Sequence, residues 1–263
     1  MKILVCISHV PDTTSKIDFS ENNTLFNNDG VQFIINPNDE FGLIRAIWFK
    51  EKIGATVDVI NVGLKNTEQT LRKALAIGAD KAIRINNVSK CSKVVAKSIS
   101  KYLESNQYDL IIAGRESIDY NGGMVPGMIS ALSKINFIDK CTSLEIAENN
   151  VKAIREIEGG IEKISTTLPL IISSQKGLVE EKDLRIPNMR GIMMARKKEL
   201  IVIEDYGFKI SSQTIKFEKP KSKNKVTLIS SDNIDKLIEL LNKEAKVIWY
   251  GYFNIRWSWK WKT

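Results

Sequence analysis

The chain has 263 residues and 43% apolar content, enough to bury one sizeable α/β core with an appendage or two small domains, and no apolar run approaches the roughly 18 residues of a membrane span. The formal net charge of +8 is spread along the chain in short basic runs with no nucleic-acid-binding motif beside them, so we expect no nucleic acid partner. Cys6, Cys91 and Cys141 lie far apart and form no CxxC pair, which argues against a disulfide framework or a metal site and indicates a reducing cytoplasm.

Five short apolar runs are typical of buried β-strands. The first directly follows the amino terminus and stops at Pro11 and Asp12 with no small-residue cleavage site, so it favours a strand over a secretory signal. A further strand at REIEGG is predicted to lead into a hairpin with Gly159 and Gly160 at its turn. The five runs are residues 3–10, 57–62, 82–85, 110–113 and 170–173.

The first helix is predicted to begin within the stretch NPNDE. Asn36 can cap it, Pro37 suits its first position, and Asp39 places negative charge at the positive end of the helix dipole. Gly54 supplies a left-handed stop at the other end. The face predicted to be buried carries Phe41, Ile44, Ile47 and Trp48.

Two further helices are predicted after the next two strands. One runs from about residue 67 to residue 77 and ends at Gly78, and the other begins after Ser92. Strands that alternate with amphipathic helices require a parallel sheet covered on both faces and joined by right-handed crossovers. We therefore expect an α/β fold with a doubly wound, mostly parallel, Rossmann-like sheet, in which a ligand lies beyond the carboxyl ends of the strands.

A glycine-rich loop follows the strand predicted at residues 110–113. It holds Gly114, Gly122, Gly123 and Gly127 and leads into a predicted helix. Such glycines can bring backbone N–H groups close to an anion, with a helix amino terminus behind them. Phosphate is the anion that we expect such a loop to bind. The loop contains neither GxGxxG nor GxxxxGK[ST], so on spacing alone a tight turn without a ligand is equally favoured.

Seven stretches stand in an order that is specific to one family. They read ILVCISHVPD from residue 3, NPNDE from 36, TLRKALAIGADKAIRI from 70, DLIIAGRESID from 109, REIEGG from 155, LPLIIS from 168 and DLRIPNMRGIMMARKK from 183. Together they span about the first 205 residues. In this order the stretches resemble the beta subunit of electron transfer flavoprotein.

The resemblance implies a non-enzymatic electron carrier with an adenine-nucleotide-binding fold. In that family an alpha/beta heterodimer holds one FAD, mostly through the alpha subunit, accepts electrons from flavin-dependent dehydrogenases and passes them on. The beta subunit buries an AMP whose phosphate lies at the glycine-rich loop, although here AMP, a second FAD and an empty site stay open. The implied cofactor contacts are Cys6, Asn36, Pro37, Asn38, Asp39, Val62, Asp119, Asn121, Gly122, Gly123, Met124, Val125, Pro126 and Gly127.

The segment 178–192 resembles the partner-recognition loop of the family. Acidic and basic residues flank Ile186, Met189 and Ile192, which gives a loop with an apolar anchor that a dehydrogenase pocket could bury. Met189 stands at the position of the family's leucine anchor, and its flexible thioether can adapt to several partners. The alternative interpretation places Met193 and Met194 in a helix core and leaves only the charges exposed.

Two charged or titratable side chains have more than one interpretation. His9, the only histidine, has no Ser, Cys or metal partner at a telling distance, so we interpret it as a polar strand-end residue and not as a base. Arg115 either belongs to the cofactor contacts, facing a pyrophosphate or the flavin, or forms a surface ion pair with Glu116 or Asp119. No catalytic residue is predicted.

The chain beyond the main domain (residues 1–205) has the pattern of an arm. A Lys-rich linker precedes a short strand and a helix that Ser231 or Asp232 could cap. In the family such an arm, here residues 206–263, reaches over to the alpha subunit. The last stretch, residues 249–263, has tryptophans alternating with polar residues, and an interface strand, a membrane-surface anchor and a functionless extension all fit it.

Two functions of other classes stay open from the sequence. An adenine-nucleotide hydrolase or ligase would use the same sheet, but it needs a phosphate motif such as SGGxDS after the first strand, and SHVPDTT at residues 8–14 is not that motif. A nucleotide-sensing homodimer would leave the segment 178–192 unexplained.

Overall fold

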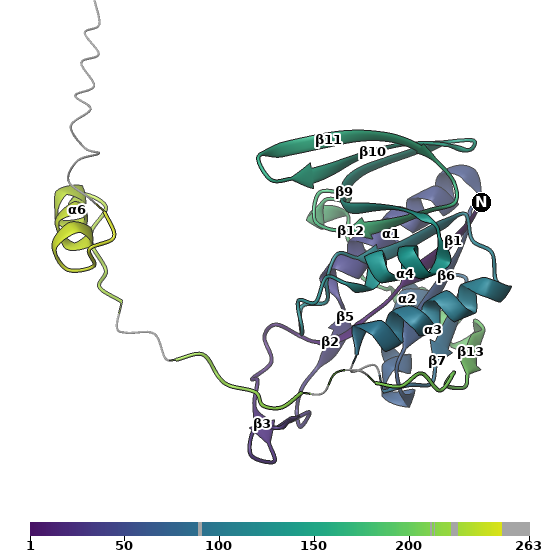
Figure 1. The fold of residues 1–263 in the computed structure, drawn as a ribbon, viewed down its shortest axis with the longest axis horizontal. Coiled ribbons are helices and arrows are strands. Elements are labelled where there is room, and N and C mark those ends of the chain that lie inside the picture. Colours follow the sequence, from purple (N-terminus) through teal and green to yellow (C-terminus); the bar gives the residue numbers. More distant parts are fainter. Residues whose placement is uncertain (89–90, 211, 213, 222–225, 249–263) are drawn as a thin grey trace, which may run out of the picture. The chain divides into compact units, whose positions relative to one another are not determined.

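The computed structural model describes residues 1–88, 91–210, 212, 214–221 and 226–248 (Figure 1). The chain divides into two compact units, Met1–Phe217 and Glu218–Thr263. The tryptophan-rich stretch 249–263 lies outside the described residues.

The first unit is built on one large sheet. Among the described residues its nine strands are ordered β11-β10-β9-β12-β8-β1-β6-β7-β13. Neighbours from β9 to β13 along this order are parallel, whereas β10 runs antiparallel to both β9 and β11. The strands are β1 (Lys2–Cys6), β6 (Thr56–Val62), β7 (Lys81–Ile85), β8 (Leu110–Gly114), β9 (Asn136–Ala147), β10 (Asn150–Ile157), β11 (Gly160–Thr167), β12 (Leu170–Ser174) and β13 (Leu200–Ile203).

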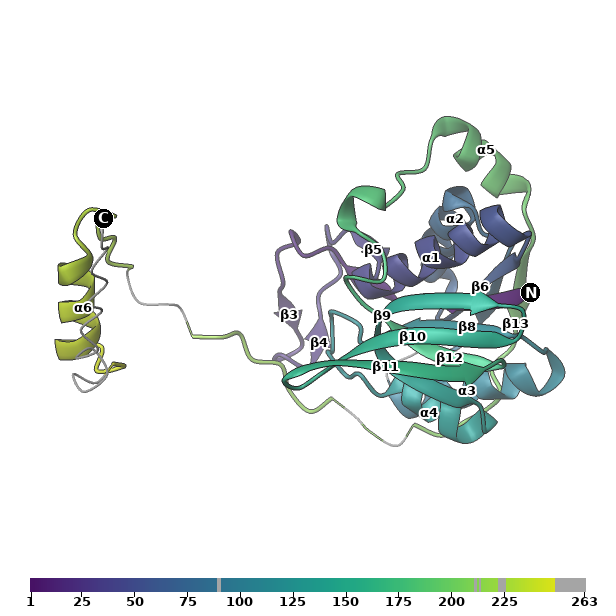
Figure 2. The same ribbon diagram turned by 90° about the horizontal axis from the view of Figure 1, so that it is seen from above.

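Helices cover both faces of this sheet, as Figure 2 shows. On one face α1 and α2 enclose a core that includes Val57 and Val59 of β6, and on the other α3 and α4 enclose a core that includes Ile60 and Val62. The alternation along β6 means that the strand is buried on both sides, which confirms the predicted doubly wound α/β fold. The helices are α1 (Pro37–Ile53), α2 (Glu68–Ile77), α3 (Ser92–Ser105), α4 (Val125–Ser133) and α5 (Met189–Lys197), with 3-10 turns η1 (Lys65–Thr67) and η2 (Glu181–Asp183).

The first predicted strand is broken in the structure. The run at residues 3–10 forms β1 and then β2 (His9–Pro11), and β2 pairs with β5 (Phe33–Ile35) instead of continuing the large sheet. Between them the Ser8 N–H leaves the sheet and donates to the side chain of Asp39. The apolar run was continuous, but a polar partner 31 residues away along the chain decides where the strand ends. A separate small hairpin is formed by β3 (Phe19–Ser20) and β4 (Leu25–Phe26).

Helix α1 begins at Pro37 and ends at Gly54 in a left-handed conformation (φ 68°, ψ 27°), as predicted. The expected cap is wrong, because the Asn36 side chain makes no capping hydrogen bond and is used elsewhere. The face predicted to be buried is also too narrow. Leu43, Ala46 and Phe49 are buried as well, whereas Trp48 is only partly buried. The helix is enclosed on more than one side because it lies against several strands of the sheet and its Arg45 side chain reaches a β9 carbonyl.

The sequence predicted only part of the remaining sheet. The hairpin at Gly159 and Gly160 is confirmed as the turn between β10 and β11, with Gly159 at φ 83°. However, the long strand β9 and the short strand β13 were not predicted, and helix α5 was expected only in the alternative interpretation that placed Met193 and Met194 in a helix. The burial of residues along β9 alternates imperfectly, and the strand shifts register at a bulge beside β12. This explains why its sequence lacks a clear period of two.

The second unit contains α6 (Ile234–Lys243). Its amino-terminal cap is Asn233, whose side chain accepts from the Lys236 N–H, so the predicted caps Ser231 and Asp232 are wrong. No strand is assigned to residues 226–230, which corrects the short strand predicted there. Across the described residues, no helix is both long and apolar enough to cross a membrane.

The close approach of α1 to the sheet depends on Gly42. A Cβ atom at this position would lie 2.5 Å from Ile112 Cγ2 and 2.7 Å from Ser174 Oγ. We expect Gly42→Ala to lower the free energy of unfolding by about 1–3 kcal/mol, because overpacking outweighs the helix propensity gained. Urea denaturation measures this, with Gly160→Ala as the control, since nothing lies within 4 Å of a Cβ there. An unchanged or raised stability of Gly42→Ala would contradict the close approach.

Candidate functional site

The chain reverses its strand order between β1 and β8. Strands β6 and β7 lie on one side of β1, whereas β8 and β12 lie on the other. At such a switch point the adjoining helices go to opposite faces and leave a crevice outside the carboxyl ends of the strands. Cys6 ends β1, Val62 ends β6 and Arg115 follows β8, so these predicted cofactor contacts all lie at this edge of the sheet.

Asp39 joins the two strands of the switch point. It lies in the first turn of α1 and is only 2% exposed. Its Oδ2 accepts from the Ser8 N–H at 2.7 Å, and its Oδ1 accepts from the Gly114 N–H at 2.7 Å. Burial raises the pKa of this carboxyl group to about 6, although the hydrogen bonds from Ser8, Asn36 and Gly114 oppose that rise. The side chain therefore fixes the exits of β1 and β8 against the start of α1.

Two asparagines hold the loop that follows β8. The Asn36 side chain donates to the Glu116 carbonyl at 2.9 Å and accepts from the Ile118 N–H at 3.2 Å. Asn38 Nδ2 donates to the same carbonyl at 3.1 Å. This use of Asn36 explains why it does not cap its own helix. The predicted residues Asn36, Asn38 and Asp39 are thus brought together around residues 114–118.

Two further positions belong to this arrangement: Gly114, predicted only as a glycine of the phosphate loop, and Ser174, which was not predicted. Gly114 has no room for a side chain, because a Cβ atom would overlap Asp39 Oδ1 and lie 2.9 Å from Asn38 Cβ. Ser174, at the end of β12, donates from its hydroxyl group to the Asn38 carbonyl at 2.7 Å. A run of polar residues directly after the apolar run LII is the only signal in the sequence that marks this serine.

The predicted phosphate loop continues from Asp119 into α4. Residues 119–124 are exposed, and the loop turns through left-handed conformations at Asn121 (φ 48°) and Gly123 (φ 58°). Val125 and Pro126 begin α4, and a Cβ atom at Gly127 in its first turn would lie 3.6 Å from Phe137 Cε1. The loop therefore places exposed backbone at Asn121, Gly122 and Gly123 in front of a helix amino terminus, between the exposed side chains of Tyr120 (58%) and Met124 (52%).

The helices that begin at this edge share one feature. None of the residues that precede α1, α2, α3 and α4 makes a side-chain capping hydrogen bond. By contrast, Asn188 caps α5 and Asn233 caps α6. In α1 the Asp39 and Glu40 N–H groups already donate to the Asn36 carbonyl, and in α2 the Glu68 N–H donates to the Lys65 carbonyl. At α3 and α4 backbone N–H groups of the uncapped first turn can donate to an anion, which the helix dipole also favours. The residues present thus fit a ligand that carries a phosphate group.

Two buried polar atoms near the same edge have no hydrogen-bond partner among the described residues. They are Nε2 of His9 and Oδ1 of Asn61. Asn61 is 5% exposed, and its Nδ2 donates to the Ile7 carbonyl at 2.8 Å, which places it against the end of β1. A buried acceptor without a donor costs about 1–3 kcal/mol. Such atoms at the mouth of a parallel sheet fit a polar ligand better than an empty crevice.

His9 is held as a structural side chain. Its Nδ1 is 2.7 Å from Thr70 Oγ1, and its ring stacks on Phe33 with centroids 4.3 Å apart. Burial lowers the pKa of His9, against the opposing charge of Asp119. Burial, with a smaller contribution from Asp39, raises the pKa of the Cys6 thiol, so that group stays protonated. Neither is arranged as a base or nucleophile, and the described residues hold no group of acidic, His and Cys side chains suited to a metal.

Arg115 forms the ion pair that was its alternative interpretation. Its guanidinium group donates to Glu116 Oε1 at 2.7 and 3.0 Å, and its NH1 donates to Gln175 Oε1 at 3.2 Å. Gln175 in turn donates to Glu156 Oε2 at 2.6 Å. These hydrogen bonds connect the loop after β8 with strand β10. The Arg115 side chain is 39% exposed, so part of it still faces solvent.

The segment 178–192 matches neither interpretation completely. Its start is core, since Leu178 and Val179 are buried, and its end is the first turn of α5. However, the helix does not bury its methionines, because Met193 and Met194 are 64% and 53% exposed. The three predicted contact residues are all exposed: Ile186 94%, Met189 73% and Ile192 38%.

Comparison with known proteins gives a consistent match. A family model described as electron transfer flavoprotein domain matches residues 24–206. The electron transfer flavoprotein subunit beta of Bacillus subtilis (strain 168) is 35% identical to this chain, covering 94% of the chain and 100% of that protein. The subunit beta of Thermoanaerobacterium thermosaccharolyticum is 31% identical over 94% of each. Protein FixA of Azotobacter vinelandii is 29% identical, over 89% of this chain and 90% of that protein.

The Asp39 bridge predicts a pH-dependent loss of stability. We expect Asp39→Asn to lower the free energy of unfolding by about 1–3 kcal/mol, because the amide can accept from only one of the two N–H groups. The pKa of the wild-type carboxyl group is raised from 3.8 to about 6. Between these two pH values the group is protonated in the folded chain but ionised in the unfolded chain. Its contribution is therefore complete below pH 4 and falls by up to about 3 kcal/mol as the pH rises through 6.

Urea denaturation at about pH 5 and about pH 7.5 tests this sign. The stability difference between wild type and Asp39→Asn should be larger at the lower pH. Asp29→Asn, at an exposed position, serves as the control and should show no such difference. A difference that grows with pH would mean that the hydrogen bonds, and not burial, dominate at Asp39.

Proposed function

We propose a function for this chain on the premise that it belongs to the electron transfer flavoprotein family, and within that family to the beta subunits. It works in electron transfer together with an alpha subunit. As an electron carrier subunit it needs no catalytic residue of its own, and we assign none. The fine points of this role, namely the nucleotide, the electron donors and the cellular location, are proposals that rest on the residues described above.

We propose that the crevice at the switch point holds AMP. The observation that carries this is the exposed loop 119–124 directly before α4, whose first turn has no side-chain cap. The backbone N–H groups at Gly122, Gly123 and the start of α4 would hold the phosphate group. Cys6, Val62 and the residues Asn36 to Asp39 would surround the rest of the nucleotide.

The polar network would act before any nucleotide arrives. Asp39 fixes the exits of β1 and β8, and Asn36 and Asn38 fix the loop after β8. Because these contacts lie within the chain, the loop is positioned in advance and binding orders fewer groups. The nucleotide would then serve as a structural part of the fold, since none of the surrounding groups is placed for acid–base or nucleophilic chemistry.

The redox chemistry belongs to FAD, which accepts and releases electrons at its isoalloxazine ring when bound. We propose that it is shared with the alpha subunit, which holds most of it. From this chain, Arg115 is the residue best placed to contribute, because it follows β8 at the carboxyl edge and is partly exposed. Its guanidinium group would orient a negative group, and its ion pair with Glu116 would have to open or turn for that.

Flavin-dependent dehydrogenases are the proposed electron donors, and the cytoplasm is the proposed location. The exposed side chains of Ile186, Met189 and Ile192 supply an apolar contact that such a partner would bury. The arm from residue 206 is proposed to contact the alpha subunit. Helix α6 supports this, because none of its residues is buried although Ile234 and Leu237 are apolar.

The cofactor content separates this function from the alternatives. We expect the chain, co-purified with its alpha subunit, to show flavin absorption bands and to release AMP and FAD in equal amounts on heating. A second FAD in place of AMP would double the flavin and leave no AMP. A colourless pair that turns over ATP would instead support a hydrolase or ligase, and nucleotide without flavin would support a sensor.

The exposed contact residues predict a binding defect without a folding defect. We expect Met189→Glu to raise the KM for the electron-donating dehydrogenase by about tenfold, because a charge replaces an apolar side chain in the contact. The flavin spectrum and the rate of reduction by dithionite should not change. Leu132→Glu on α4, where the leucine is 48% exposed, is the control. An unchanged KM for Met189→Glu would exclude this surface as the docking site.

A further inference from the structure

Residues 185–198 form an arch over α1 and α2, as Figure 2 shows for α5 and the segment that leads into it. On either side of its exposed part the chain is anchored in the core, with Leu184 packed against it and Ala195 only 2% exposed. Between these anchors Ile186 and Met189 face solvent. The position of these two side chains therefore depends on what fixes the arch.

At its carboxyl end the arch is fixed firmly to α2. Arg72 NH1 donates to the Ala195 and Lys198 carbonyls at 2.8 and 2.7 Å, and Lys198 Nζ donates to the Leu75 and Ala79 carbonyls at 3.0 and 2.5 Å. Each of the two helices thus has its terminal carbonyl groups satisfied by a cation from the other. The backbones also come close, since a Cβ atom at Gly191 would lie 2.7 Å from the Ala76 carbonyl oxygen.

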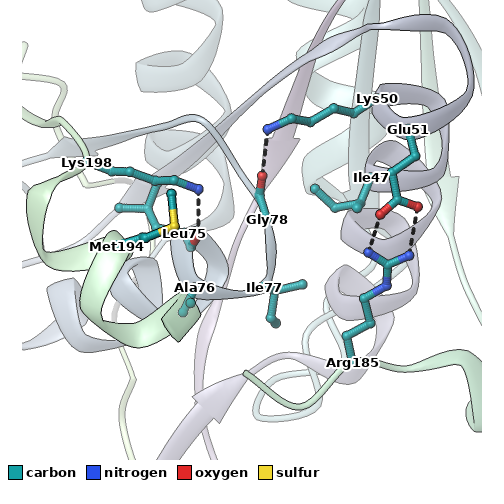
Figure 3. Close-up of a pocket in the computed structure, with 11 residues that line it drawn as sticks. Ile47, Lys50, Glu51, Leu75, Ala76, Ile77, Gly78, Arg185, Met194 and Lys198 are labelled. Carbon is teal, nitrogen blue, oxygen red and sulfur yellow. Dashed lines mark hydrogen bonds and ion pairs between the residues drawn. The ribbon is translucent and has the colours of Figure 1, made fainter. Parts of the chain in front are cut away.

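At its amino end, next to the core contact of Leu184, the arch is held by an ion pair. Arg185 NH1 and NH2 donate to the two carboxylate oxygens of Glu51 at 2.6 and 2.8 Å (Figure 3). Glu51 lies near the end of α1, so the pair connects the arch to a helix that the core holds in place. Both side chains are partly exposed, at 36% and 54%. Fork-to-fork pairs of this kind fix orientation more strictly than a single contact does.

A cavity of about 290 Å³ lies between the Glu51–Arg185 ion pair and the contacts of Lys198 with α2. Figure 3 shows Arg185 on one side of it and Lys198 and Met194 on the other, with Ile77 between them. Because of this cavity the arch is not packed continuously onto the helices beneath it. The Glu51–Arg185 pair is then the contact that holds the stretch next to Ile186.

We propose that Glu51 and Arg185 are positioning residues for electron-donor docking, which hold Ile186 and Met189 of the arch in the orientation that a partner binds. This rests on the proposed function of the segment. A segment that is already ordered loses less conformational freedom when a partner binds it. Breaking the pair should therefore weaken docking and leave the electron transfer step itself unchanged.

A charge swap distinguishes this role from direct contact of Arg185 with the partner. We expect Glu51→Arg and Arg185→Glu each to raise the KM for a flavin dehydrogenase that reduces the wild-type heterodimer by about five- to tenfold, with kcat within about twofold, because each places like charges together. The double variant, in which the pair is re-formed in reverse, should return the KM to within about twofold of the wild-type value.

Arg155→Glu is the matched control. Arg155 forms a single-contact ion pair with Glu162 at 2.5 Å in the β10–β11 hairpin, with similar exposed fractions of 35% and 45%, so an exposed ion pair is lost away from the arch. Its KM should stay at the wild-type value. Reduction by dithionite and the flavin spectrum should be the same in all variants.

Hydrogen exchange of the heterodimers gives a second readout that needs no dehydrogenase. The amides of residues 185–191 should exchange faster in both single variants and regain protection in the double variant. The proposal is overturned if the double variant is as impaired as the single ones, or if exchange and KM are unchanged in the single variants. A wild-type heterodimer that contains flavin but accepts electrons from no dehydrogenase would instead refute the proposed function.

Discussion

The buried carboxylate of Asp39 is the contact on which the arrangement of the carboxyl edge depends. A parallel sheet that reverses its strand order must leave the ends of two neighbouring strands without a helix directly above them. Here the Ser8 and Gly114 N–H groups at those ends both donate to Asp39 in the first turn of α1. Gly114 can carry no side chain, and β1 must end where Ser8 turns away.

This contact has a consequence for the rest of the edge. Since Asn36 and Asn38 are used to hold the loop after β8, neither side chain caps α1, and the Asp39 and Glu40 N–H groups donate to the Asn36 carbonyl instead. The same edge contains the unpartnered His9 Nε2 and Asn61 Oδ1. Polar atoms left in this state lower stability unless a ligand satisfies them. A polar ligand that bonds to these two atoms would remove that cost, which supports the proposed nucleotide.

The sequence predicts the parts of this fold whose energetics are local. Strands such as β6 and β8 are buried on both faces, so their apolar runs are continuous and easily recognised. Strand β9 could not be recognised because a bulge and a mixed environment break its period. At the site, Asn36 has the sequence of a cap but the role of a loop contact, because its partners lie 80 and 82 residues away along the chain. Partners that distant leave no local pattern.

Helix α1 connects the carboxyl edge of the sheet with the arch. Its first turn carries Asp39 and its last turns carry Glu51, and 17 helical residues span roughly 25 Å. The helix is enclosed on several sides and Gly42 sets its distance from the sheet. Asp39 fixes the strand exits near its amino end, and Glu51 binds Arg185 near its carboxyl end. One packed helix therefore positions both the carboxyl edge of the sheet and the amino end of the arch.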